Sequence, residues 1–128
     1  MNKMLEDIEE FHKKFDLAHS GEVRELPLEV AAFRTQFIAE ELIEYSKAVD
    51  EHDIEGQLDA LVDLTYVVLG TAYLQGFDFQ AAWDEVHSAN MRKVKAGPNG
   101  EGSKRGSSHD VIKPEGWVGP DHSKIILP

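Results

Sequence analysis

Five carboxylates in the middle of the chain have the types and the spacing of a metal site: Glu40, Glu41, Glu44, Asp59 and Asp63. The three glutamates are close enough for one side of a helix to present them together, and the two aspartates, four residues apart, would share a face of the next helix. No basic residue stands at helical spacing beside the aspartates. Carboxylate oxygens without a cationic partner suit Mg²⁺, Mn²⁺ or Ca²⁺ rather than zinc or copper.

The two acidic groups would face each other across a helical hairpin. A turn is expected at residues 50–53, and Glu44 and Asp59 are equally distant from its middle, as are Glu40 and Asp63. In an antiparallel pair of helices, residues equally distant from the turn lie at the same height. We therefore expect four or five carboxylates to converge. The glutamates alone could form an ordinary solvated helix face, but two aspartates inside an apolar helix are harder to explain that way.

The elements that must hold these acids are helices. Apolar residues recur at helical spacing in four segments, which predicts helices over about residues 2–17, 28–49, 54–75 and 79–95. Pro27 suits the start of the second helix, and Asp53 is a plausible N-cap for the third. The connections are short, so neighbouring helices should be antiparallel. We expect an all-α fold with a four-helix bundle-type core.

The third predicted helix is apolar almost all round between Leu58 and Leu74, apart from its two aspartates. A helix without a polar face is buried in a large core or in an interface between chains. A helical unit of fewer than 100 residues offers little core to surround it. The sequence therefore predicts an oligomer, either a homodimer or a dimer of dimers.

The composition changes near residue 96. The segment 97–128 holds six of the ten glycines and four of the five prolines. We expect a helical domain, which carries the five acids, over residues 1–96 and a Gly/Pro-rich arm or lid over 97–128, since loops of this kind often close over ligands. Lys104, Arg105 and Lys113 stand in or beside its Gly-rich sequence. A poorly ordered terminus is the alternative.

The overall charge and composition exclude several classes of function. A formal net charge of −11 disfavours binding to nucleic acid, and the absence of cysteine excludes disulfides and thiolate metal sites. No apolar run is long enough to cross a membrane, and the acidic N-terminal residues do not resemble a signal peptide. We expect a cytoplasmic protein.

Residues near the end of the fourth predicted helix could bind an anion. His87, Asn90 and Lys93 fall on about one face, and Lys93 or Arg92 could reach an anionic group. The alternative is that Arg92 and Lys93 only stabilise the negative end of the helix dipole.

Three stretches of the chain resemble a known superfamily. These are the Glu-Glu-x-x-Glu run at 40–44, the acid-bearing apolar run at 59–70, and the His-x-x-Asn-x-x-Lys segment within 85–94. Together they resemble the all-α nucleoside triphosphate pyrophosphatases, which include MazG-like proteins, dimeric dUTPases and phosphoribosyl-ATP pyrophosphohydrolase. The likeness covers about residues 28–95. One departure is that the family's second acidic motif has an acid three residues before its aspartate, whereas Asp59 is four before Asp63.

This resemblance implies Mg²⁺-dependent hydrolysis of (d)NTPs, with Mn²⁺ as a possible substitute, between the α and β phosphates. It implies metal binding by Glu40, Glu44, Asp59 and Asp63, activation of water by Glu41, and contacts of Asn90, Arg92 and Lys93 with substrate phosphates. The partner would be a small-molecule nucleotide, and Arg34, one turn before the glutamates, is a weaker candidate for contact with it. Two alternatives remain, which are hydrolysis of phosphoribosyl-ATP and a non-catalytic, metal-binding helical oligomerisation module.

Overall fold

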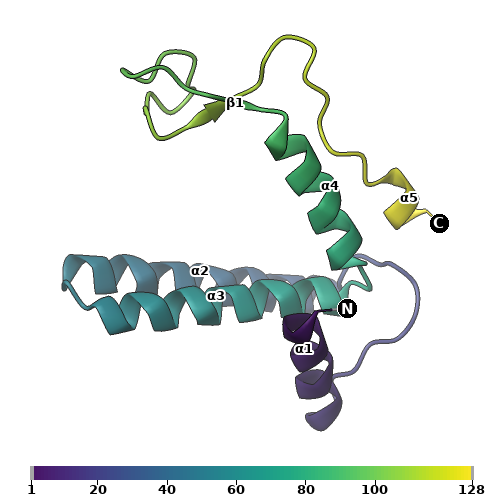
Figure 1. Ribbon diagram of the computed structural model, residues 1–128. Coiled ribbons are helices and arrows are strands. Elements are labelled where there is room, and N and C mark those ends of the chain that lie inside the picture. Colours follow the sequence, from purple (N-terminus) through teal and green to yellow (C-terminus); the bar gives the residue numbers. More distant parts are fainter. Residues whose placement is uncertain (1, 128) are drawn as a thin grey trace. The chain divides into compact units, whose positions relative to one another are not determined.

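The computed structural model describes residues 2–127 and is mainly helical, which confirms the predicted all-α fold (Figure 1). Its elements are α1 (Lys3–Lys14), α2 (Leu28–Asp50), α3 (Ile54–Leu74), α4 (Phe79–Met91), β1 (Val94–Lys95), β2 (Val111–Ile112) and α5 (Ser123–Ile126). The chain forms two compact units, one ending at Phe79 and the other beginning at Gln80. Each unit is described by itself.

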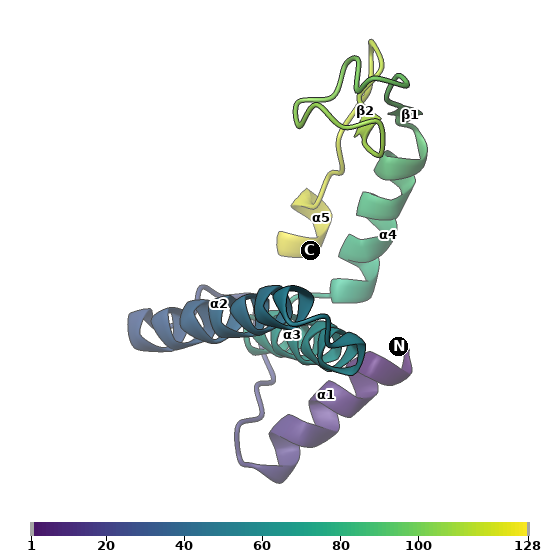
Figure 2. The same ribbon diagram turned by 90° about the vertical axis from the view of Figure 1, so that its left-hand side faces the viewer.

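In the N-terminal unit, α2 and α3 form an antiparallel hairpin, and α1 packs against α3 (Figures 1 and 2). The hairpin turn is tight because His52 adopts a positive φ of 56°. Asp53 caps α3 as predicted, since its Oδ1 accepts a hydrogen bond of 2.9 Å from the backbone N–H of Gly56. The turn thus fixes the register of α2 against α3.

The contact between α1 and α3 is apolar and aromatic. Ile8 and His12 are almost completely buried, at 1% and 2% exposed. The His12 ring lies 4.7 Å from that of Tyr73, and Phe11 meets Tyr66 edge-on at 5.4 Å between ring centres. His12 Nδ1 lies 2.7 Å from the backbone oxygen of Ile8, so this polar atom is satisfied within its own helix.

Arg34 fastens α2 to the C-terminal half of α3. Its Nε donates to Thr71 Oγ1 at 3.0 Å, and its Nη2 donates to the backbone oxygen of Val67 at 2.8 Å. Gly70 leaves the space for this contact, because a Cβ there would lie 2.8 Å from Arg34 Nη2. Partial burial lowers the pKa of Arg34 from its ordinary value. The side chain thus has a role in joining the two helices.

In the C-terminal unit, the tail folds back on α4. β1 pairs with β2 in an antiparallel ribbon, which continues as a hydrogen bond from the Ala96 N–H to the Asp110 carbonyl at 2.9 Å. Trp117 Nε1 donates to the backbone oxygen of Ala89 in α4 at 2.7 Å. The tail is therefore held by specific contacts, although it contains six of the ten glycines.

Two predicted helix ends were wrong. The first helix ends at Lys14 rather than near residue 17, because Asp16 adopts a positive φ of 57° that breaks the helical path. The fourth ends at Met91 rather than near residue 95, because the β-branched Val94 joins the two-stranded ribbon instead. The other ends lie within a residue or two of prediction. The domain boundary at residue 96 and the lid role of the tail stay predictions.

One face of α3 is exposed within the single chain. Leu58, Leu61 and Val62 are 65%, 46% and 55% exposed, whereas Ala60, Val67 and Leu69 are buried. Within residues 2–127, no single helix is long and apolar enough to cross a membrane; only α3 and α4 taken together would pass by length and composition.

Candidate active site

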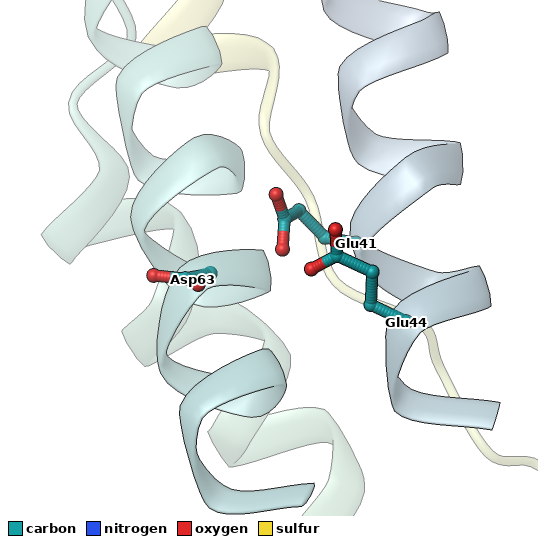
Figure 3. A group of neighbouring side chains, drawn as sticks. All are labelled: Glu41, Glu44 and Asp63. Carbon is teal, nitrogen blue, oxygen red and sulfur yellow. The ribbon is translucent and has the colours of Figure 1, made fainter. Parts of the chain in front are cut away.

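The hairpin brings three carboxylates together at one place. Glu41 and Glu44 project from α2 toward α3, which carries Asp63 (Figure 3). Each offers one oxygen, and these three oxygens all lie within 4.8 Å of one another. We call these three residues the acidic cluster. Its formation follows from the helical spacing of the two glutamates and from the register that the turn imposes.

The acidic cluster is partly buried, and its negative charges are not compensated by basic side chains of residues 2–127. Glu41 is only 9% exposed, and its Oε2 has no hydrogen-bond partner among the residues that the structure describes. Burial raises the pKa of Glu41, and the charges of Glu44 and Asp63 raise it further. Burial also raises the pKa of Asp63, with added repulsion from Asp59 and Glu44. No ion pair reaches the cluster from residues 2–127.

These observations fit a divalent cation. A buried carboxylate oxygen without a partner is costly, and several neighbouring carboxylates repel one another. An oxygen-preferring cation would neutralise the repulsion, and the orphaned oxygen of Glu41 would remain free to accept a hydrogen bond from water. The donor set contains only carboxylates, which is typical of Mg²⁺ or Mn²⁺ sites.

The two remaining predicted ligands lie beside the acidic cluster, not within it. Asp59 is exposed but close enough to Asp63 to affect its pKa through charge and hydrogen bonding. It lines an open cavity of about 530 Å³ together with Leu58 and Val62. Glu40 is exposed and lies 3.4 Å from the amide of Gln36. Of the four predicted ligands, only Glu44 and Asp63 therefore belong to the acidic cluster. Its third member is Glu41, the residue predicted to activate water.

The three residues predicted to bind phosphate belong to the C-terminal unit. Asn90 is exposed at the end of α4. Arg92 donates to Ser88 Oγ at 2.7 Å and to the Val118 carbonyl at 3.2 Å, so it connects α4 to the tail. Lys93 is half-buried, with its Nζ 5.2 Å from the ring centre of Trp117.

The predicted site set omitted Lys113 and Trp117, which the structure places beside Lys93. The signal that could have found them is the pair of short extended runs Lys93-Val94-Lys95 and Val111-Ile112-Lys113. If these runs pair as antiparallel strands, the two lysines come opposite each other.

The raised carboxyl pKa values predict how pH affects stability. Since the folded protein holds these protons more tightly than the unfolded chain, the metal-free protein should gain stability as pH falls from 7 toward the ordinary glutamate value of 4.5. With saturating Mg²⁺ the trend should reverse, because the cation binds the deprotonated carboxylates. Thermal melts with EDTA or Mg²⁺ across this range would measure both slopes.

The double variant Glu41→Gln with Asp63→Asn provides the control for this pH dependence. The double variant keeps nearly all of the chain's net negative charge. Any change of its melting temperature with pH therefore reports general charge repulsion. If the wild type and the double variant had equal slopes in EDTA, the acidic cluster would not be the cause.

Comparison with known proteins gives one family match. Residues 8–90 match the family model described as phosphoribosyl-ATP pyrophosphohydrolase, which is more than half of the chain and includes all five predicted acidic residues. No curated protein matches the chain.

Proposed function

We propose a substrate and a cofactor from one premise: this chain belongs to the phosphoribosyl-ATP pyrophosphohydrolase family and is a nucleotide pyrophosphohydrolase. The proposed substrates are (d)NTPs, and the proposed cofactor is Mg²⁺. Water is added across the anhydride between the α and β phosphates, and the products are a nucleoside monophosphate and pyrophosphate. The observation that carries the metal requirement is the acidic cluster itself, whose three oxygens lie within 4.8 Å of one another and have no ion-pair partner among residues 2–127. The small-molecule substrate would come from the cytoplasmic nucleotide pool.

Glu44 and Asp63 are the proposed main ligands of the metal, and Asp59 and Glu40 are further carboxylates at its edge. A bound Mg²⁺ supplies charge neutralisation of the phosphates and lowers the pKa of water. The carboxylates themselves bring the cation to a place where a polyanionic substrate would otherwise be repelled.

Glu41 is the proposed acceptor of the proton from the attacking water. Its pKa is raised by burial and by its acidic neighbours, which brings a carboxylate closer to the range where it is an effective general base at neutral pH. Its Oε2 is free to accept a hydrogen bond. The side chain also lies close to the proposed ligands, as a residue that orients water at the metal must.

Hydrolysis of phosphoribosyl-ATP is the second candidate function, favoured by the description of the matched family. The bond that is cleaved is of the same kind, so the acidic cluster does not separate the two substrates. The family match ends at residue 90, however, and the C-terminal unit beyond it carries contacts of its own. Growth of a histidine-requiring strain that lacks this activity, when supplied with the gene, would favour phosphoribosyl-ATP; absence of growth together with dNTP hydrolysis would favour (d)NTPs.

The exposed face of α3 supports a further part of the proposal, that the enzyme works as a homodimer or a dimer of dimers. Leu58 and Val62 are more than half exposed in the single chain, although they lie in an otherwise apolar helix. A face of this kind is typical of an interface between chains.

We expect the protein to have at least twice the 14.3 kDa mass of one chain in solution. Val62→Lys should lower the mass in solution toward that of a monomer. The introduced lysine would be buried at the interface of the oligomer, whereas it is solvated in the monomer. Light scattering after size exclusion measures this mass. Val118→Lys, at a 69% exposed position in the C-terminal unit, is the matched control. A monomeric wild type would contradict the prediction.

A further inference from the structure

The C-terminal unit contains a pocket of about 480 Å³ whose charged lining is almost entirely positive. Lys93, Lys104, Arg105 and Lys113 line it, with Asp110 as the one carboxylate. We call it the basic pocket. Its position is unexpected in a chain of net charge −11, in which acids outnumber bases by 24 to 13. Gathering four cations in one concavity raises their mutual repulsion unless an anion joins them.

The ribbon places two of these lysines opposite each other. Val94 pairs with Ile112 and Lys95 with Val111, so the next antiparallel pair in this register is Lys93 with Lys113. Like charges directly opposite on neighbouring strands are destabilising. The fold therefore maintains a repulsive pair at the wall of a pocket.

Trp117 holds both of these lysines. The Nζ atoms of Lys93 and Lys113 lie 5.2 Å and 5.0 Å from the centre of its ring. The ring is itself fixed by the hydrogen bond from its Nε1 to the Ala89 carbonyl at 2.7 Å. Such cation–π contacts orient an ammonium group without neutralising it. The ring therefore positions both ammonium groups and supplies no negative charge to pair with them.

The single acid of the basic pocket does not neutralise these lysines. Asp110 accepts hydrogen bonds from Ser103 Oγ at 2.7 Å, from Arg105 Nη1 at 2.9 Å and from the Val111 N–H at 2.9 Å. These bonds lower its pKa and occupy its oxygens. Over residues 2–127, none of Lys93, Lys104 and Lys113 has an acid within ion-pair distance.

We infer that the basic pocket is a binding site for the phosphate groups of a small polyphosphate, either pyrophosphate or the phosphate chain of a nucleotide. Three unpaired ammonium groups and a nearby guanidinium match the charge of such an anion, and lysine is a common phosphate ligand. The volume is in the range of small-molecule sites, which favours a compact anion over a polymer. That the anion is the substrate's own phosphate chain rests on the proposed function; the binding of pyrophosphate does not.

The inference is tested by titrating the full chain with pyrophosphate in EDTA. Without a divalent cation the acidic cluster repels phosphate, so binding under these conditions reports the basic pocket alone. The emission of Trp117 is the signal, in a Trp83→Phe background that removes the other tryptophan, which is 61% exposed. We expect a saturable change in emission.

The double variant Lys104→Gln with Lys113→Gln should weaken pyrophosphate binding by about tenfold or more. Lys95→Gln is the matched control, because Lys95 lies on the same ribbon but does not line the pocket. Circular dichroism checks that each variant folds, and Lys113→Arg, which keeps the charge, should retain binding. No saturable change in the wild type, or equal binding by the double variant, would overturn the inference.

Further ligands separate the possible sources of the anion. A nucleotide with a non-hydrolysable α–β bridge that competes with pyrophosphate would show that one pocket takes both. A single-stranded oligonucleotide that bound more tightly than pyrophosphate would overturn the inference in favour of a polymer. If pyrophosphate binds but no nucleotide is hydrolysed with Mg²⁺, the inference stands and the proposed function fails. If a nucleotide is hydrolysed but pyrophosphate does not bind, the proposed function stands and the inference fails.

Discussion

Asp63→Asn should reduce pyrophosphate release by about 10³-fold or more, since losing a charged ligand removes several kcal/mol of metal-dependent stabilisation of the transition state. Asp63 is the carboxylate that α3 contributes to the acidic cluster, and no other acid of that helix has an oxygen in the same set of close neighbours. The variant should also lose the rise in melting temperature that Mg²⁺ gives the wild type. Steady-state kinetics and thermal melts with and without Mg²⁺ measure both effects.

The variant should fold, because the amide has the shape of the carboxylate and removes a repulsive charge. The pKa of Asp63 is raised by burial and by Asp59 and Glu44, so its charge is unfavourable in the metal-free protein. Asp50→Asn is the matched control, at an exposed position at the end of α2. Activity of Asp63→Asn near that of Asp50→Asn would remove Asp63 from the site.

Glu41→Gln should have opposite effects on stability and on activity. The metal-free protein should melt at a higher temperature, since a buried, repelled carboxylate is replaced by a neutral amide. The value of kcat should fall by about 10²–10⁴-fold, which is the usual contribution of a general base. The Mg²⁺ concentration for half-maximal activity should change little, because Glu44 and Asp63 remain.

The dependence on Mg²⁺ concentration distinguishes two roles for Glu41. If Glu41 mainly holds the metal, the variant would need far more Mg²⁺ and recover activity at saturation, which would contradict its role as the base. Glu10→Gln, an exposed change on α1, controls for the loss of one negative charge. Equal melting temperatures of Glu41→Gln and Glu10→Gln in EDTA would show that Glu41 is not strained by burial.

The helices and the acidic cluster could be predicted because their signals are local. Helical spacing places Glu41 and Glu44 on one side of α2, and the short turn capped by Asp53 sets their height against Asp63. The relative roles of the five acids could not be predicted, because burial depends on the rotation of each helix about its axis. That rotation leaves Glu40 exposed and Glu41 buried, although they are neighbours in sequence.

The C-terminal unit was harder to predict because its contacts join residues far apart in the chain. The hydrogen bond from Trp117 to Ala89 and the pairing of Val94 with Ile112 have no periodic signal in the sequence. Arg34 is a related case, since its place one turn before the glutamates suggests a nucleotide contact, and the structure shows it donating to Thr71 and Val67 of α3. A long cationic side chain can serve packing or binding, and only its neighbours show which.

The family match supports an enzyme rather than the non-catalytic helical module that the sequence alone left open. The substrate is the part of the proposal that depends on experiment, because phosphoribosyl-ATP and (d)NTPs contain the same kind of anhydride. An assay of substrate preference must therefore identify the products formed from each nucleotide as well as the rate at which they form.

The most direct test of the central claim is ³¹P NMR of the products formed from a panel of NTPs, dNTPs and phosphoribosyl-ATP with Mg²⁺, alongside an EDTA control and Asp63→Asn. We expect pyrophosphate and a nucleoside monophosphate from at least one (d)NTP, no reaction in EDTA, and almost none with Asp63→Asn. Release of orthophosphate and a diphosphate, or equal rates with and without the divalent cation, would contradict a metal-dependent cleavage between the α and β phosphates at the acidic cluster.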